Sequence, residues 1–266
     1  MAEVKGNDLF QGLRAVAKRI GQRVPDLLFP PACPLCHARV AAASDLCPGC
    51  REELTPDPGH HCQRCGTPVA AGSSSGAFPE SGCPACKEHT DTPDRLHCAF
   101  LHTGAARELV LGSKFRDRPH WITTMGRLLW EEIGPTLAWE EPEMIIPIPL
   151  HPRRLVWRRF NQAALLAREV ASRLERPLVT NALFRIRMTP SQIRLNREER
   201  RRNMVGAFRA LPNRVGGRSL LLVDDVLTTG ATIRAASAAL REAGAGRVVV
   251  ACLCRADHHP VTDDLH

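Results

Sequence analysis

The chain has 266 residues, of which 44% are hydrophobic and 24% are charged, a composition typical of soluble globular proteins. No stretch approaches the roughly 18 apolar residues of a membrane span, and no apolar run with a cleavage site opens the sequence, so we expect a cytoplasmic protein without a signal or transit peptide. The formal net charge of +8 favours partners that carry phosphate, such as a phosphorylated ligand or nucleic acid.

The composition changes along the chain and predicts three parts. Apolar residues recur at spacings of three and four between Leu9 and Val24, with arginines and lysines between them, which predicts an amphipathic leading helix in residues 1–30. We interpret its apolar face as packed on the protein itself rather than on a membrane. Residues 31–95 form a cysteine-rich segment, and residues 96–266 alternate apolar segments in the manner of an α/β domain.

The cysteine-rich segment predicts zinc. Eight of the eleven cysteines form C-x-x-C pairs, the spacing at which one tight turn presents two thiolates to a metal ion. Four such pairs make two closed tetrahedral sites, so we expect about two structural Zn²⁺ in a double zinc ribbon, with metal binding supplying the folding free energy of a segment that lacks a core. Sequential and interleaved pairings both fit the spacing, and we prefer sequential pairing. The pairs are Cys33/Cys36, Cys47/Cys50, Cys62/Cys65 and Cys83/Cys86.

The α/β domain begins with a series of elements read from apolar periodicity. A short apolar run that ends in prolines predicts a buried strand, and the arginine-rich stretch after it predicts a loop at the carboxyl end of that strand. Asn161 is the predicted cap of the next helix. The expected elements are strand Cys98–His102, helices Ala105–Leu111 and Ile122–Leu137, strand Met144–Pro149, loop Leu150–Phe160 and helix Asn161–Leu174.

An arginine-rich run follows from Arg185 to Arg209, with only two acidic residues in it. Arginine is suited to bidentate contact with phosphate, so we favour a mobile anion-binding loop over a solvated face. Single-stranded DNA is a secondary prediction, because aromatic side chains for base stacking are scarce. The arginines predicted to contact DNA are Arg153, Arg154, Arg158, Arg159, Arg201 and Arg202.

The segment from Leu220 to Ala243 carries the strongest functional signal. Leu220–Val223 predicts a strand buried on both faces, and the helix Ile233–Ala243 follows a turn rich in threonine. Backbone N–H groups and hydroxyls at the start of a helix form a phosphate site. The carboxylates of Asp224 and Asp225 precede that turn and suit ribose hydroxyls or Mg²⁺. A last strand is expected at Arg247–Cys254.

Residues 220–232 resemble the thirteen-residue signature of type I phosphoribosyltransferases, the enzymes that bind 5-phosphoribosyl-1-diphosphate (PRPP). The chain as a whole resembles the ComF family of competence-associated proteins, called GntX in some bacteria. The resemblance rests on LLFPPACPLC (27–36), IPIPL and RRFNQA within 146–167, TPSQIRLNREERRRNMVGAF (189–208) and LLVDDVLTTGAT (221–232). It implies a type I phosphoribosyltransferase-like parallel sheet with flanking helices, preceded by a small double zinc-ribbon domain.

The resemblance also implies roles for single residues. Asp224 and Asp225 would hold the ribose hydroxyls and a metal ion, and the loop after Pro147 would hold pyrophosphate. Lys114 stands in the family's K-[FY] position. The 5′-phosphate would be held by Thr228, Thr229, Gly230, Ala231 and Thr232, and the loop that closes over the site would include Gln192, Arg200 and Asn203.

Three positions depart from the family pattern. His102 stands where the family often has Tyr, Asp117 stands where it has Gly, and Arg159 precedes Phe160 where it has R-G-F. The last departure predicts a less tightly turned loop.

Two functions compete at this stage. One is a Mg²⁺-dependent phosphoribosyltransferase whose acceptor cannot be read from the sequence. The alternative is a non-catalytic single-stranded DNA-binding competence factor that uses the PRPP fold as a scaffold, because the family's role in natural transformation implies contact with DNA and DNA-uptake proteins. A fold shared by many activities does not decide between them.

Overall fold

A computed structural model describes residues 30–42, 45–67, 82–88, 91–115, 118, 121–188 and 203–256. The chain divides into two compact units, Met1–Arg51 and Glu52–His266. The predicted leading helix lies outside the described residues, and the domain boundaries expected from composition stay predictions. In the described part of the chain, no helix is both long enough and apolar enough to cross a membrane.

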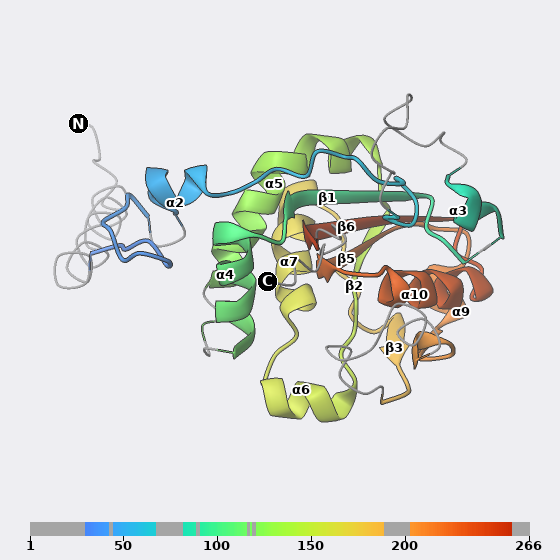
Figure 1. Cartoon of the computed structure of the whole chain (residues 1–266). Helices are drawn as coiled ribbons and strands as arrows, with labels where there is room; N and C mark the ends of the chain where they lie inside the picture. Colours follow the sequence, from blue (N-terminus) through green and yellow to red (C-terminus); the bar gives the residue numbers. More distant parts are fainter. Residues whose placement is uncertain are drawn as a thin grey trace, which may run out of the picture. The chain divides into compact units, whose positions relative to one another are not determined.

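The larger unit is built on a four-stranded parallel sheet in the order β1-β6-β5-β2, drawn in Figure 1. The strands are β1 (Arg95–Leu101), β2 (Met144–Pro147), β5 (Ser219–Leu227) and β6 (Arg247–Arg255). In β5 the residues Leu220–Val223 are fully buried, as are Val248–Cys252 in β6, which is why both read as uninterrupted apolar runs. The predicted parallel sheet with flanking helices is confirmed.

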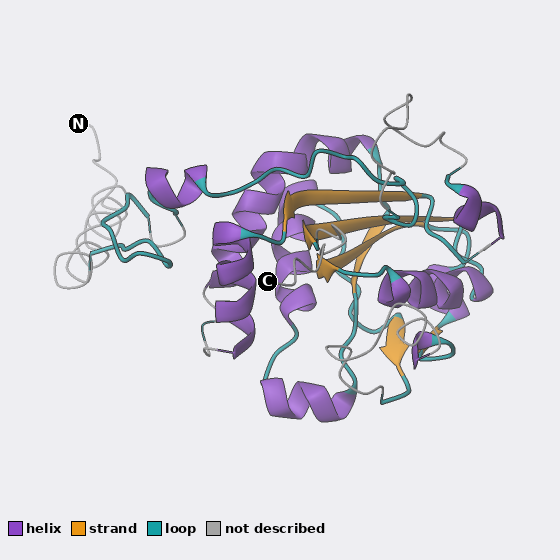
Figure 2. Ribbon diagram, in the orientation of Figure 1, coloured by secondary structure: helices purple, strands orange, loops and turns teal. Residues whose placement is uncertain are grey.

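Helices cover both faces of this sheet (Figure 2). On one face α5 (Trp121–Trp139) and α7 (Gln162–Leu174) pack on the strands, and α4 (Gly104–Phe115) packs on α5. On the other face α10 (Ala231–Glu242) packs with an antiparallel hairpin of β3 (Leu183–Arg185) and β4 (Phe208–Ala210), next to the short helix α9 (Pro212–Val215). Alternate residues of each strand therefore face two separate apolar layers.

The strand order reverses between β2 and β5. After β2 the chain runs outward through α7 to Leu178, which bridges Ile145 in parallel, whereas after β5 it runs the other way through α10 to β6. In open parallel sheets ligands bind where such a reversal leaves a crevice at the carboxyl ends of the strands. The fold therefore predicts a ligand site at the carboxyl ends of β2 and β5.

Two local predictions are corrected by the structure. The acidic pair does not follow its strand but lies within it, because pairing with β6 continues through Asp224, Val226 and Leu227. The arginine-rich stretch expected as a loop contains α6 (Pro152–Arg158), which starts with Pro152 and with the His151 side chain accepting a hydrogen bond from the Arg153 amide.

The end of α6 is left-handed despite the missing glycine. Arg159, at the position where the family pattern has Gly, closes the helix in the left-handed conformation with φ 63° and ψ −23°. That conformation ordinarily favours glycine because a Cβ atom crowds the backbone there. The helix end is therefore held in a strained conformation, and the looser loop stays a prediction.

Candidate functional site

An acidic pair lies in the second half of β5. The backbone N–H of Asp225 donates to Oδ1 of Asp224 at 2.9 Å, which fixes the Asp224 carboxyl group against the backbone of β5. Lys114, in the last turn of α4, forms an ion pair with Asp225, with Nζ 2.7 Å from Oδ2. Both of these side chains are largely buried, at 18% and 11% exposure. The predicted residues Lys114, Asp224 and Asp225 are therefore brought into one cluster.

The electrostatics of the pair favour a bound cation or hydroxyl donors. Burial, and then the charge of Asp225, raise the pKa of Asp224 to about 7, while Lys114 acts in the opposite direction. A carboxylate that loses this much solvation is stabilised by a metal ion or by hydrogen bonds from a ligand. The donor set of two adjacent carboxylates fits Mg²⁺, which prefers oxygen ligands.

The turn that follows offers donors for an anion. Gly230 adopts a left-handed conformation with φ 73° and begins α10 without a side-chain cap. The first N–H groups of a helix have no acceptor within the helix, so those of Ala231 and Thr232 are placed to bind a ligand. Oγ1 of Thr229 is buried and has no hydrogen-bond partner in the described structure. A buried hydroxyl without a partner costs stability unless a ligand satisfies it.

The end of β2 lies beside β5 at Val223, just before the acidic pair. Pro147 aligns with Val223, and the backbone N–H of Ile148 donates to the Val223 carbonyl at 2.9 Å. Asn161 caps α7 as predicted, because its Oδ1 accepts from the Ala163 amide while its Nδ2 donates to the Ile148 carbonyl. The loop after Pro147 is thus tied to both β5 and α7.

Two arginines near the acidic pair were not predicted from the sequence to bind the phosphoribosyl ligand, although Arg158 was predicted to contact DNA. Partial burial lowers the pKa of Arg158, at the end of α6, and the negative charge of Asp225 opposes this. Burial and the charge of Arg154 lower the pKa of Arg185, on β3, to about 10, against the charge of Asp224. Their sequence signal was only membership of arginine-rich runs, whereas their position depends on long-range packing.

His102 is a further residue of this edge. It follows β1 directly, and its backbone N–H donates to the Arg255 carbonyl at 2.7 Å. Burial, and then the charges of Lys114 and Arg107, lower the pKa of His102. Its Nε2 is buried without a hydrogen-bond partner in the part of the chain described. The sequence marked this position only as a departure from the family pattern.

The remaining predicted residues are placed in part. Asn203 lies just before β4, and its backbone oxygen accepts from Arg187 at 2.6 Å. Arg153, Arg154 and Arg158 lie on α6, and Arg159 ends it. Gln192, Arg200, Arg201 and Arg202 lie outside the described residues.

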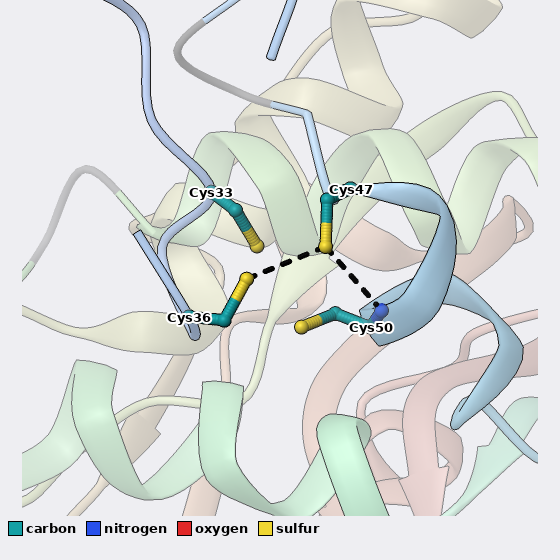
Figure 3. Close-up of side chains that lie close together, drawn as sticks. All are labelled: Cys33, Cys36, Cys47 and Cys50. Carbon is teal, nitrogen blue, oxygen red and sulfur yellow. Dashed lines mark hydrogen bonds between the residues drawn. The ribbon is translucent and has the colours of Figure 1, made fainter. Parts of the chain in front are cut away.

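The first cysteine cluster, in the smaller unit, joins two neighbouring C-x-x-C pairs (Figure 3). Its four Sγ atoms lie within 4.8 Å of one another, and those of Cys36 and Cys47 are 3.4 Å apart. The second pair sits at the start of α2 (Pro48–Glu52), where the Cys50 amide donates to the Cys47 sulfur. The members are Cys33, Cys36, Cys47 and Cys50.

The second cysteine cluster belongs to the larger unit and brings together Cys62, Cys65, Cys83 and Cys86, all buried. Its sulfur atoms are 3.5 to 3.8 Å apart where they are in contact. Tetrahedral zinc with Zn–S distances of about 2.3 Å requires sulfurs roughly 3.8 Å apart, so both clusters fit the metal. The pairing is sequential, and the two Cys₄ clusters are consistent with two structural zinc ions. The short helix α3 (Pro84–Glu88) carries Cys86.

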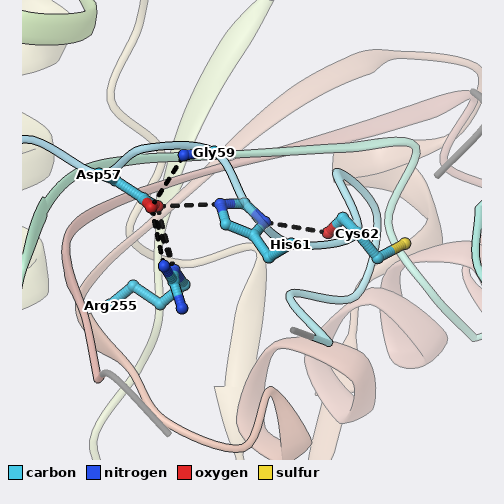
Figure 4. Close-up of polar contacts among 5 residues, drawn as sticks. All are labelled: Asp57, Gly59, His61, Cys62 and Arg255. Carbon is cyan, nitrogen blue, oxygen red and sulfur yellow. Dashed lines mark hydrogen bonds and ion pairs between the residues drawn. The ribbon is translucent and has the colours of Figure 1, made fainter. Parts of the chain in front are cut away.

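A buried polar group ties the segment before Cys62 to β6 (Figure 4). Asp57 accepts hydrogen bonds from Nε2 of His61 at 2.9 Å and from Nη2 of Arg255 at 2.9 Å. The Nδ1 atom of His61 lies 3.2 Å from the backbone oxygen of Cys62. His61 therefore braces the second cysteine cluster from outside rather than replacing a thiolate.

Comparison with known proteins agrees with both halves of this picture. Residues 24–81 match the double zinc ribbon domain, and residues 161–265 match the phosphoribosyl transferase domain. The DNA utilization protein YhgH of Salmonella typhimurium is 34% identical over 199 residues, covering 73% of this chain and 83% of the relative. Competence protein F of Haemophilus influenzae is 31% identical over 222 residues, covering 81% and 92%. Competence protein ComFC of Bacillus subtilis is 26% identical over 208 residues, covering 75% and 79%.

The parallel sheet, the acidic strand end and the two Cys₄ clusters define a protein that joins a double zinc ribbon to a domain of the phosphoribosyltransferase type. Its relatives cover most of its length at identities above 30%. The chain belongs to the ComF family, as the sequence motifs predicted.

Proposed function

We propose that this protein binds PRPP or another phosphoribosyl ligand, together with Mg²⁺, at the carboxyl end of β5. The observation that carries the proposal is the position of the buried, partnerless hydroxyl of Thr229 between the acidic pair and the start of α10. One side of the turn offers carboxylates for ribose and metal, and the other offers donors for a phosphate.

The roles of the residues follow from this arrangement. Thr229 and the first amides of α10 bind the 5′-phosphate, while Asp224 and Asp225 bind the ribose hydroxyls and Mg²⁺. The loop after Pro147 binds the pyrophosphate. When bound, the metal ion supplies positive charge that favours departure of pyrophosphate. Lys114 holds the carboxyl group of Asp225 in place through an ion pair of 2.7 Å in a largely buried setting.

The chemistry we propose is transfer of the phosphoribosyl group by charge stabilisation, without a protein nucleophile. A cavity of about 490 Å³ next to Pro147 gives an acceptor room. Its lining is mostly apolar and includes Leu155, Phe184 and the buried Arg185.

Titration calorimetry with Mg²⁺ and PRPP or ribose 5-phosphate tests the site. We expect the Asp224→Asn/Asp225→Asn variant to lose metal-dependent binding, and Glu108→Gln, an exposed acid on α4, to bind as the wild type does. Equal affinity in all three proteins would remove the site. Release of pyrophosphate from PRPP, measured with and without nucleobases or DNA, separates an enzyme from a binding protein.

A second proposal concerns DNA, and α6 supports it. This helix carries three arginines and no acidic residue, and none of its residues is buried. Trp157 on it is 70% exposed, between Arg154 and Arg158. Exposed aromatic rings among arginines suit single-stranded nucleic acid, whose bases stack while its phosphates bind the cations. Relatives named for competence and DNA utilization support a role in DNA uptake.

A further inference from the structure

The first turn of the second cysteine cluster lies directly against the candidate phosphate turn. A methyl group on Gly230 would lie 2.9 Å from the backbone oxygen of Cys65. A methyl group on Gly66 would lie 2.7 Å from Cδ2 of Leu227. Real Cβ atoms do not approach other atoms so closely, so the two segments, Cys62–Gly66 and Leu227–Gly230, are interlocked through glycines.

Each segment is also fixed from its other side. The turn of the cysteine pair is closed by the Gly66 amide, which donates to the Cys62 carbonyl at 2.9 Å, and it is joined to β1 where the Leu96 amide donates to the Gln63 carbonyl at 2.6 Å. The carbonyl of Leu227 accepts from the Ala256 amide at 2.8 Å. Displacement of the cysteine turn would therefore be transmitted to Gly230.

We propose that the second cysteine cluster, when it holds its metal, positions the phosphate turn at Leu227–Gly230. The left-handed φ of 73° at Gly230 sets the direction in which the N–H groups of Ala231 and Thr232 point. The backbone of Cys65 packs directly against Gly230. When they are bound to zinc, the thiolates of Cys62 and Cys65 add to the backbone hydrogen bonds that hold this segment. Zinc binding at the second cysteine cluster therefore determines how well ordered the phosphate turn is. On the function proposed above, it also determines the affinity of this turn for phosphate.

The first cysteine cluster provides an internal comparison. It belongs to the other compact unit, so loss of its metal should leave the order of the phosphate turn unchanged. A general loss of stability on zinc removal would not discriminate between the two clusters in this way.

Hydrogen exchange of the full-length zinc-loaded protein, followed by mass spectrometry of peptides covering residues 220–235, tests the coupling without any ligand. We expect Cys86→Ser to raise exchange at the turn by about fivefold or more, the size of a typical coupling between sites. The Cys36→Ser protein should exchange as the wild type does there, with metal analysis showing one zinc lost from each variant. Equal protection of the turn in all three proteins would overturn the proposal.

A glycine pair keeps the test decisive if Cys86→Ser fails to fold. Gly66 and Gly59 have nearly the same positive φ, 74° and 71°, so alanine is equally strained at both. A methyl group at Gly66 would strike Leu227, whereas one at Gly59 meets nothing within 4 Å. Gly66→Ala should raise exchange at the turn and Gly59→Ala should not. The same exchange in both variants would contradict the proposal.

Reciprocity supplies a second readout, because two coupled sites must affect each other equally. Release of zinc to a chromogenic chelator should show two phases, and ribose 5-phosphate should slow only the phase that Cys36→Ser retains. If the wild type does not bind ribose 5-phosphate, the proposed function fails and the exchange experiment alone decides the coupling. Binding that slows neither phase would overturn the coupling while leaving the phosphate site in place.

Discussion

Asp57 and Arg255 form a buried ion pair across most of the length of the sequence, with Oδ1 and Nη2 2.9 Å apart and side chains 2% and 5% exposed (Figure 4). Burial would raise the pKa of Asp57, but the hydrogen bonds from His61 and Arg255 outweigh it and lower the pKa to about 2. The folded pKa therefore lies below the unfolded value of about 3.9. The pair stabilises the fold above pH 4 and loses that effect as the pH falls toward 2.

Removal of one partner should be costly. We expect Arg255→Met to lower the free energy of unfolding by about 3 to 5 kcal/mol, because it leaves the carboxylate of Asp57 buried with His61 and the Gly59 amide as its remaining partners. The loss should be constant between pH 6 and 8, where Asp57 stays ionised. Urea unfolding followed by circular dichroism measures both. Arg107→Met, which breaks an exposed pair with Glu108, should cost no more than about 1 kcal/mol. A similar cost for both variants would refute the buried-pair interpretation.

The left-handed Arg159 gives a prediction of the opposite sign. Glycine adopts φ 63° without crowding by a Cβ atom, so Arg159→Gly should raise the free energy of unfolding by up to about 1 kcal/mol. Val156→Gly is the control within the same helix: Val156 is 82% exposed on α6, and glycine there should cost about 0.5 to 1 kcal/mol. Thermal unfolding at one pH compares the two. Destabilisation by both would show that the arginine side chain stabilises the turn more than the strain costs.

Asp224 should make stability depend on pH. The folded pKa of Asp224, about 7, lies above its unfolded value. Asp224 therefore contributes most to the stability of the wild type below pH 4, and the free energy of unfolding falls as the pH rises to 7. Asp224→Asn removes the titrating charge. The free energy of unfolding of this variant should therefore rise relative to that of the wild type by up to about 2 kcal/mol between pH 5.5 and 7, since one pKa unit corresponds to about 1.4 kcal/mol. The difference between the two free energies of unfolding should then stay constant to pH 8. Unfolding in Mg²⁺-free buffer measures this difference. A difference that does not change with pH would contradict the raised pKa of Asp224.

The sequence predicted those elements whose residue types follow directly from their local environment. Leu220–Val223 and the run that begins at Arg247 are continuously apolar because both faces of those strands are buried, and Asn161 is a residue type that caps helices. The cysteine spacing predicted two zinc sites for the same local reason. It could not fix the pairing, because sequential and interleaved arrangements use the same turns, and only the tertiary contacts separate them.

The parts that the sequence did not predict depend on distant segments or lack a periodic signal. No residue of α6 is buried, so this helix has no apolar stripe packed on a neighbour from which periodicity could reveal it. His102, Arg158 and Arg185 influence or join the acidic edge from three different elements. The contact between Cys65 and Gly230 joins a zinc ribbon to a strand end more than a hundred residues later, and no local pattern encodes it.

The last prediction concerns α6 and single-stranded DNA. If arginines of this helix neutralise phosphates, the logarithm of the affinity should fall linearly with the logarithm of salt concentration, with a slope of about −0.7 for each phosphate contacted. Arg153→Ala/Arg154→Ala should make the slope shallower by about 1.4. Trp157→Ala should weaken binding about tenfold with the slope unchanged, because stacking is not an ionic contact. Fluorescence anisotropy with an oligothymidine at several salt concentrations measures both quantities.

Matched controls separate this helix from the overall basic charge of the protein. Trp139, at the end of α5, is 87% exposed, so Trp139→Ala removes an indole even more accessible than that of Trp157 from an element other than α6. Arg127, also on α5, pairs with Glu131 on the surface, and Arg127→Ala should leave the salt slope unchanged. Competition adds a further distinction: α6 follows the strand that ends at Pro147, so DNA bound there and PRPP should displace each other if they share that loop. Unaltered binding by Trp157→Ala and by the double arginine variant would remove α6 from DNA recognition and leave the phosphoribosyl site as the remaining proposal.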